Sequence, residues 1–183
     1  MGNKNQIIKF ILHAFSLYIL WFIFYDYFIE PNGKLNSWLN SLLAHSGSFV
    51  LSLIGYNSDV VIIGNQILLR INATNLLGVG NSCNGLELFV LFAGFIVCFP
   101  GNAKNKIWFV PVGIISIHVL NSIRAAALAL NQYYYPQSLS FNHHYTFTII
   151  VYAFIFYLWI LWANKVARKN KLPTDESVKD HSQ

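Results

Sequence analysis

The sequence predicts an all-α integral membrane protein: a bundle of about four transmembrane helices, an amphipathic or re-entrant helix on the outer leaflet and a small extracytoplasmic β-hairpin. Three observations support this fold class. Of the 183 residues, 55% are hydrophobic and only 10% are charged, which is unusual for a soluble domain of this length. Four apolar runs approach the roughly 20 residues that a bilayer requires. The basic residues lie beside these runs, as topology signals do.

The first apolar run covers residues 7–28. It has Lys4 before it and Lys9 near its start, ends in an aromatic cluster, and has neither the short apolar core nor the cleavage site of a secretory signal. We therefore interpret it as an uncleaved span. The three other expected spans cover residues 86–100, 107–131 and 145–163.

Basic residues in the connections predict the orientation. Lysines and arginines occur before the first span, in residues 101–106 and after the last span, whereas residues 132–142 contain none. By the positive-inside rule, both termini are cytoplasmic and the span count is even.

We expect a single membrane-embedded domain over residues 1–168, located in a bacterial inner membrane. Residues 169–183 are expected to form a polar, disordered cytoplasmic tail.

Residues 38–55 are apolar but interrupted by polar side chains. If this segment crossed the bilayer, the basic tail would lie outside, so we expect it to lie on, or dip into, the outer leaflet. Residues 60–63 and 66–71 are β-prone runs around Gly64-Asn65, which is typical of a hairpin. Because an isolated hairpin is marginal in water, we expect it to pack on the outer-leaflet segment or on the ends of the spans.

The sequence gives no indication of a metal, a cofactor or a nucleic-acid partner. Its two cysteines, Cys83 and Cys98, would be about 22 Å apart on one helix, too far for a disulfide. There is no CxxC pair, zinc-type Cys/His spacing or group of carboxylates, so we expect no metal and no cofactor. The net charge of +5 comes from residues beside apolar runs, so the expected partner is the bilayer and not a nucleic acid.

The predicted topology brings three reactive groups to the outer side at a similar depth. Cys83 lies at the outer mouth of the second span, Arg124 about 10 Å below the outer end of the third, and His143 and His144 at the start of the fourth. These are the candidate catalytic residues. A histidine can deprotonate the thiol and later protonate a leaving amine, and an arginine can stabilise an oxyanion or hold a carboxylate.

Each candidate also has a structural interpretation. A lone cysteine is most often an inert small residue, but Cys83 precedes Asn84-Gly85 at a predicted helix start, where the helix dipole favours a thiolate. An arginine inside a span costs about 2.5–3.5 kcal/mol, so Arg124 either serves the site, locks helices together or snorkels to the interface. Asn121, one turn earlier, is its expected partner.

Other polar residues are supporting or structural candidates. Glu87, one turn after Cys83, either orients a histidine or the arginine, or forms a structural ion pair with Arg124. We assign Cys98, His45 and His118 to structural roles.

Taken together, three motifs resemble the exosortase/archaeosortase family of membrane-embedded, sortase-like cysteine transpeptidases, and in particular its short stand-alone members. The motifs are Asn81-Ser-Cys83-Asn-Gly-Leu86, Asn121-Ser-Ile-Arg124 and His143-His144, in that order. The resemblance covers roughly residues 60–163. Cys-Asn-Gly here replaces the Cys-Ser-Gly of many members, which leaves the turn intact.

The resemblance implies that Cys83, Arg124 and one of the two histidines are catalytic. His144 is favoured, because the family usually has a small residue four positions after its histidine and Thr148 fits this better than Phe147. The implied substrates are exported proteins whose C-terminal signal consists of a short motif, a hydrophobic helix and a basic end. The enzyme would cleave at the motif through a Cys83 thioester and transfer the product to a lipid or glycan acceptor. A separate hypothesis, which rests only on the position of the hairpin, is that residues 60–71 pair with the motif as an added strand.

Three other functions are compatible with the same residues. One is a small transporter or channel in which Arg124 binds an anion and the histidines relay protons. Another is a structural partner in an envelope assembly. The third is an acyl- or lipid-transferring enzyme, which would also need Cys83. Replacing Cys83 with alanine would be nearly silent in a transporter and would inactivate either enzyme.

Overall fold

The computed structural model describes residues 2–73, 75–99 and 101–170. The elements are, in order, α1 (Gly2–Phe24), η1 (Tyr25–Ile29), α2 (Glu30–Asn32), α3 (Lys34–Leu53), β1 (Ser58–Ile63), β2 (Gln66–Ile71), β3 (Asn75–Val79), η2 (Asn81–Cys83), α4 (Leu86–Cys98), α5 (Ala103–Tyr134), η3 (Pro136–Ser138), α6 (Leu139–Phe141), η4 (Asn142–Thr146) and α7 (Phe147–Asn170). Elements η1 and η4 are π-helical turns, and η2 and η3 are 3₁₀ turns. The tail predicted to be disordered covers residues 169–183, and its residues 171–183 lie outside the described residues.

Three described helical stretches are long and apolar enough to cross a membrane, at Ile11–Asn32, Ala103–Tyr134 and Pro136–Val166. The protein is therefore a mostly helical membrane protein. Helix α4 is shorter than the span predicted at residues 86–100. Its 13 residues extend about 20 Å, whereas the hydrocarbon core of a bilayer is about 30 Å thick. Helix α4 ends at Phe99, whose backbone is extended before Pro100, since a residue that precedes proline avoids the helical conformation.

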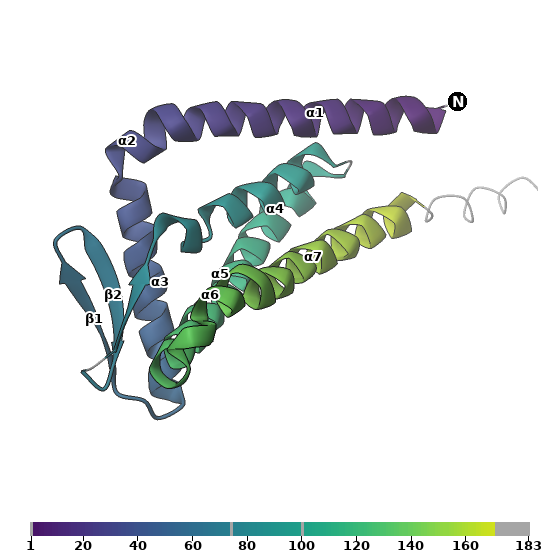
Figure 1. Cartoon of the computed structure of the whole chain (residues 1–183). Coiled ribbons are helices and arrows are strands. Elements are labelled where there is room, and N and C mark those ends of the chain that lie inside the picture. Colours follow the sequence, from purple (N-terminus) through teal and green to yellow (C-terminus); the bar gives the residue numbers. More distant parts are fainter. Residues whose placement is uncertain (1, 74, 100, 171–183) are drawn as a thin grey trace, which may run out of the picture.

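The long helices alternate in direction along the chain. Helices α1, α4, α5 and α7 run back and forth, while α3 and the sheet lie at one end of the bundle (Figure 1). The N-terminal end of α1, the connection between α4 and α5 and the C-terminal end of α7 lie toward the other end (Figure 1). In that connection, a Cβ on Gly101 would lie 2.8 Å from Trp162 of α7. The basic segments that the sequence assigns to one side of the membrane therefore share one end of the bundle.

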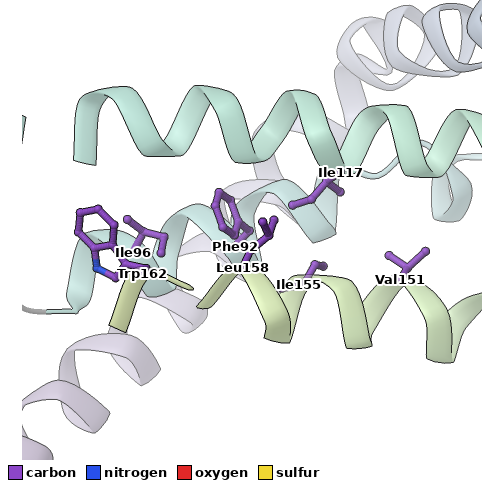
Figure 2. Packing of buried hydrophobic residues seen from close by; sticks show 7 residues of the cluster. All are labelled: Phe92, Ile96, Ile117, Val151, Ile155, Leu158 and Trp162. Atoms are coloured by element: carbon purple, nitrogen blue, oxygen red, sulfur yellow. The ribbon is translucent and has the colours of Figure 1, made fainter. Parts of the chain in front are cut away.

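The main core lies between α4, α5 and α7. Figure 2 shows its side chains in the space between the helices. The buried members are Phe92 and Ile96 from α4, Ile117 from α5, and Val151, Ile155, Leu158 and Trp162 from α7. A Cβ on Gly113 of α5 would lie 2.1 Å from the Phe92 ring, so this ring occupies space that only a glycine leaves free. This close approach fixes α4 against α5.

The three strands form an antiparallel sheet in the order β1-β2-β3. Strands β1 and β2 are joined through Gly64-Asn65, and β3 pairs with the other edge of β2. The sequence analysis did not predict β3, because its sequence Asn-Leu-Leu-Gly-Val contains a glycine and only one β-branched residue. On β1 and β2, Asp59 and Arg70 form a cross-strand ion pair, and hydrogen bonds from Arg70 hold the pKa of Asp59 below its ordinary value.

Helix α3 packs against both the sheet and α5, and α5 also contacts β2 and β3 directly. One face of the sheet is buried against these helices through Ile67, Leu69, Ile71 and Val79. At the helix crossing, a Cβ on Gly47 of α3 would lie 3.3 Å from Ala125 of α5. Small residues at such crossings allow two helices to approach closely. The crossing fixes the position of the end of α5 that carries Arg124.

We predict that Gly113→Ala lowers the free energy of unfolding by about 1–3 kcal/mol, because the Phe92 ring must move to accept the methyl group. Unfolding of the purified protein in detergent, followed by circular dichroism, measures this difference. Val112→Ala is the control on the same helix, since Val112 is 56% exposed and its truncation is expected to cost less than about 0.5 kcal/mol. Equal losses in the two variants would contradict the assigned packing.

Candidate active site

The candidate site is built around the short turn that joins β3 to α4. Cys83 ends η2, and its backbone N–H donates to the Gly80 carbonyl at 2.9 Å. Gly85 follows with φ +85°, a left-handed conformation that a glycine adopts without strain, and α4 begins at the next residue. The chain thus reverses sharply and leaves Cys83 at the N-terminal end of α4, where the helix dipole favours an anion.

The histidine beside this cysteine is His143. The distance between Cys83 Sγ and His143 Nε2 is 2.9 Å, which is within hydrogen-bonding range. His144 points elsewhere and is exposed, with its Nδ1 2.8 Å from the Ser140 carbonyl oxygen. The geometry therefore does not support the preference for His144. Thr148, the small residue behind that preference, donates instead to the His143 carbonyl at 3.1 Å.

Arg124 approaches the site from α5. Its guanidinium donates to the His143 carbonyl at 3.4 Å, and its Nε is buried without a hydrogen-bond partner among the described residues. The guanidinium therefore retains a free donor near the thiol and the imidazole. Asn121, expected to pair with Arg124, donates instead to the Cys83 carbonyl at 2.7 Å. The two residues lie one turn apart on α5. Asn121 holds the Cys83 backbone, and Arg124 lines the same cavity as Cys83.

A network of buried side-chain amides holds the Cys83 turn. Asn84 accepts a hydrogen bond from the Leu86 N–H at 2.9 Å and donates to Asn36 of α3 at 3.1 Å. Asn36 in turn donates to the Tyr25 hydroxyl at 3.2 Å. Because a buried amide is costly without partners, these bonds fix the turn relative to α1 and α3.

The side-chain amides of Asn40 and Asn81 provide a second link between α3 and this turn, at 2.9 Å. The sequence analysis missed Asn36, Asn40 and Tyr25. The sequence contained one signal for the two asparagines. Asn36 lies just before the apolar 38–55 segment and Asn40 lies within it, four residues apart and therefore on one helix face.

A small cavity of about 30 Å³ joins the three reactive groups. Its lining includes Cys83, Arg124 and His143, together with Leu77, Gly78 and Val79 of β3. This volume is about that of one or two water molecules. The strand that reaches the reactive groups is β3, whereas no residue of the 60–71 hairpin lines this cavity.

Glu87 has neither of the two roles expected of it. It is exposed, and within the described ranges it has no hydrogen bond and no ion pair. The ion pair found in those ranges joins Asp59 and Arg70. Its side chain lines a different cavity, between α1 and α4. No carboxylate therefore contacts His143 or Arg124 in the described part of the chain.

The remaining candidates lie away from the thiol. Cys98 is at the opposite end of α4. His45 bonds to the Ser41 carbonyl of its own helix at 2.7 Å, and His118 Nε2 lies 3.1 Å from Ser46 Oγ between α5 and α3. In the described residues, no group of three or more His, Cys, Asp or Glu side chains could hold a metal ion.

This arrangement defines a class of site: a thiol, an imidazole and a guanidinium around one cavity, at the end of an apolar helix bundle. Residues 6–163 match the family model of transmembrane exosortases. The chain belongs to the transmembrane exosortase family, which at the family level means a membrane-embedded sorting transpeptidase of the cysteine type. The family indicated by the sequence motifs is thereby confirmed. No curated protein and no solved structure matches the chain.

We predict that His143→Gln slows alkylation of Cys83 by N-ethylmaleimide roughly tenfold near pH 7, because the thiol loses the imidazole that can accept its proton. The measurement uses a Cys98→Ser background, so that Cys83 is the only thiol. His144→Gln is the matched control and should alkylate at the parent rate. The reverse pattern would restore His144 as the candidate base.

We also predict that Asn36→Leu destabilises the protein by about 1–3 kcal/mol, because the Asn84 amide is then buried without its acceptor. The same variant should slow Cys83 alkylation, since the turn loses its link to α3. Unfolding in detergent and the alkylation rate are the two readouts. Asn57→Leu, at an exposed position before β1 where the side chain has no hydrogen bond within the described ranges, is expected to change neither. An Asn36 variant that behaves like it would exclude a positioning role.

Proposed function

We propose that this protein is a cysteine transpeptidase that cleaves exported proteins at a C-terminal sorting signal, with Cys83 as nucleophile, His143 as general acid and base, and Arg124 as oxyanion stabiliser. The observation that carries this proposal is the 2.9 Å contact between Cys83 Sγ and His143 Nε2, in a cavity that Arg124 also lines. Membership of the exosortase family supplies the reaction class.

In the first half of the reaction, the Cys83 proton passes to His143 Nε2 and the sulfur attacks the scissile carbonyl carbon. The carbonyl oxygen becomes an oxyanion, which accepts a hydrogen bond from the Arg124 guanidinium. When the tetrahedral intermediate collapses, the carbon–nitrogen bond breaks and His143 returns its proton to the leaving amine. The products are a thioester on Cys83 and a released C-terminal peptide.

In the second half, an acceptor nucleophile attacks the thioester carbonyl. His143 removes the proton of the acceptor and transfers it to the departing Cys83 sulfur, so the enzyme returns to its starting state. A lipid or glycan acceptor gives an anchored product, whereas water gives a hydrolysed one. Arg124 stabilises the oxyanion in this step as in the first.

We place the site on the outer face of a bacterial inner membrane, with both termini in the cytoplasm. This orientation is supported by the separation of the basic segments from the reactive residues along the bundle. The sorting motif then lies in an extended conformation beside β3, because Leu77, Gly78 and Val79 line the cavity. This replaces the hairpin at residues 60–71 as the strand nearest the substrate.

The test compares wild type with Cys83→Ala in cells. We expect exported proteins to retain a hydrophobic C-terminal helix in Cys83→Ala and to lose it in wild type, as mass spectrometry of membrane proteins would detect. Cys98→Ala is the matched control and should process like wild type. Identical processing in all three strains, with loss of a transport phenotype only in Arg124→Ala, would favour a transporter over a peptidase.

A further inference from the structure

A second and much larger cavity lies between α1, α4 and α7. Its volume is about 630 Å³. Its lining is mostly apolar and aromatic, and it comprises Ala14, Leu17, Tyr18, Trp21, Phe22, Tyr25 and Asp26 from the first helical stretch, Glu87, Val90, Leu91, Gly94 and Phe95 from α4, and Tyr152 and Trp159 from α7. The reaction steps above make no use of this cavity, which we call the lateral groove.

The lateral groove is elongated along the bundle. Along α1 and η1 its lining spans Ala14 to Asp26, which is about 18 Å, or more than half of a bilayer's hydrocarbon core. Helix α1 packs mainly on α4, where a Cβ on Gly94 would lie 3.0 Å from Leu17, and it diverges from α7 (Figure 1). The groove therefore lies beside a helix that most of the bundle does not contact.

Two carboxylates mark one end of the groove. Asp26 and Glu87 both line it, both are exposed, and neither has a hydrogen bond or ion pair within the described ranges. Glu87 lies in the first turn of α4, four residues after Cys83, so this is the end nearest the nucleophile. The rest of the lining carries no formal charge.

We propose that the lateral groove binds the hydrophobic helix of the sorting signal, with the N-terminus of that helix at Asp26 and Glu87. The inference rests on the proposed function, in which a motif beside Cys83 is followed directly by an apolar helix. The first turn of any helix has unpaired N–H groups and a partial positive charge, which two carboxylates complement. A groove that continues from the nucleophile's end along the bundle suits a helix covalently attached to the motif.

The groove is also linked to the nucleophile. Tyr25 lines it, and the Tyr25 hydroxyl accepts a hydrogen bond from Asn36, which bonds to Asn84 beside Cys83. An occupant that contacts Tyr25 thus touches the first residue of the network that holds the Cys83 turn. We infer that an occupied groove positions the thiol for attack.

The binding test uses a photoreactive p-benzoylphenylalanine at Leu91, on α4 inside the groove. The control position is Ile115 on α5, which is 62% exposed. Ile115 lies at about the same depth in the bundle as Leu91, because its neighbours Gly113 and Ile117 pack against Phe92, the residue next to Leu91. The full-length Cys83→Ala protein is reconstituted in vesicles of phosphatidylethanolamine and phosphatidylglycerol. The probe is a synthetic peptide of about 20 leucines and alanines with a C-terminal lysine cluster.

We expect the probe to crosslink to the Leu91 position at least several-fold more than to the Ile115 position. Asp26→Asn combined with Glu87→Gln should weaken this crosslinking roughly two- to fivefold, as expected for the loss of charges at a helix N-terminus. Crosslinks from Leu91 to lipid alone, or equal yields at the two positions, would overturn the proposal. In those cases the groove is a lipid site or an ordinary lipid-facing surface.

A cell-based measurement separates this inference from the proposed function. Leu91→Trp fills the groove and should reduce the processing of exported proteins at least several-fold, whereas Ile115→Trp should process like the parent. If the parent removes C-terminal helices and Leu91→Trp does so equally well, the groove assignment fails and the peptidase function stands. If the parent itself removes none, the function fails.

Discussion

The site depends on the fixed position of one short turn, from Cys83 to Gly85. A thiol can contact an imidazole from another helix only if both backbones are held, and this turn is held by neutral amides from α3 and α5. Asn36 and Asn121 make these bonds inside the protein. Neutral amides avoid the large desolvation cost of buried charges, provided that every donor and acceptor is paired. The network therefore holds the turn without adding charge beside Cys83.

The N-terminal end of α4 adjoins two cavities of different size. Helix α4 has only 13 residues, against 32 in α5 and 24 in α7, and it begins three residues after Cys83. On one side of that N-terminus is the small cavity with Arg124 and His143, and on the other is the lateral groove with Glu87. In the proposed function and the proposed use of the lateral groove, these adjacent surfaces would hold the scissile bond and the substrate helix at the same time.

Two π-helical turns lie close to this site, and each changes which side chain faces it. Element η4 presents His143, and not His144, to the thiol, and η1 brings Tyr25 to Asn36. A π-turn inserts one residue into a helix and rotates everything after it, and such turns are frequent at functional sites. The preference for His144 rested on the position of Thr148 in the sequence, whereas the structure shows Thr148 bonded to the His143 carbonyl and His143 beside the thiol.

The sequence by itself determined the membrane class, the family and the side chains that meet at one end of the bundle, because hydrophobic length, basic loops and the motifs around Cys83 and Arg124 are local signals. Tertiary structure decided the rest. Strand β3 exists because β2 offers it an edge, His143 and not His144 meets the thiol, and Glu87 faces a groove and not the arginine. Each of these outcomes depends on what a neighbouring element provides, and a linear pattern does not contain that information.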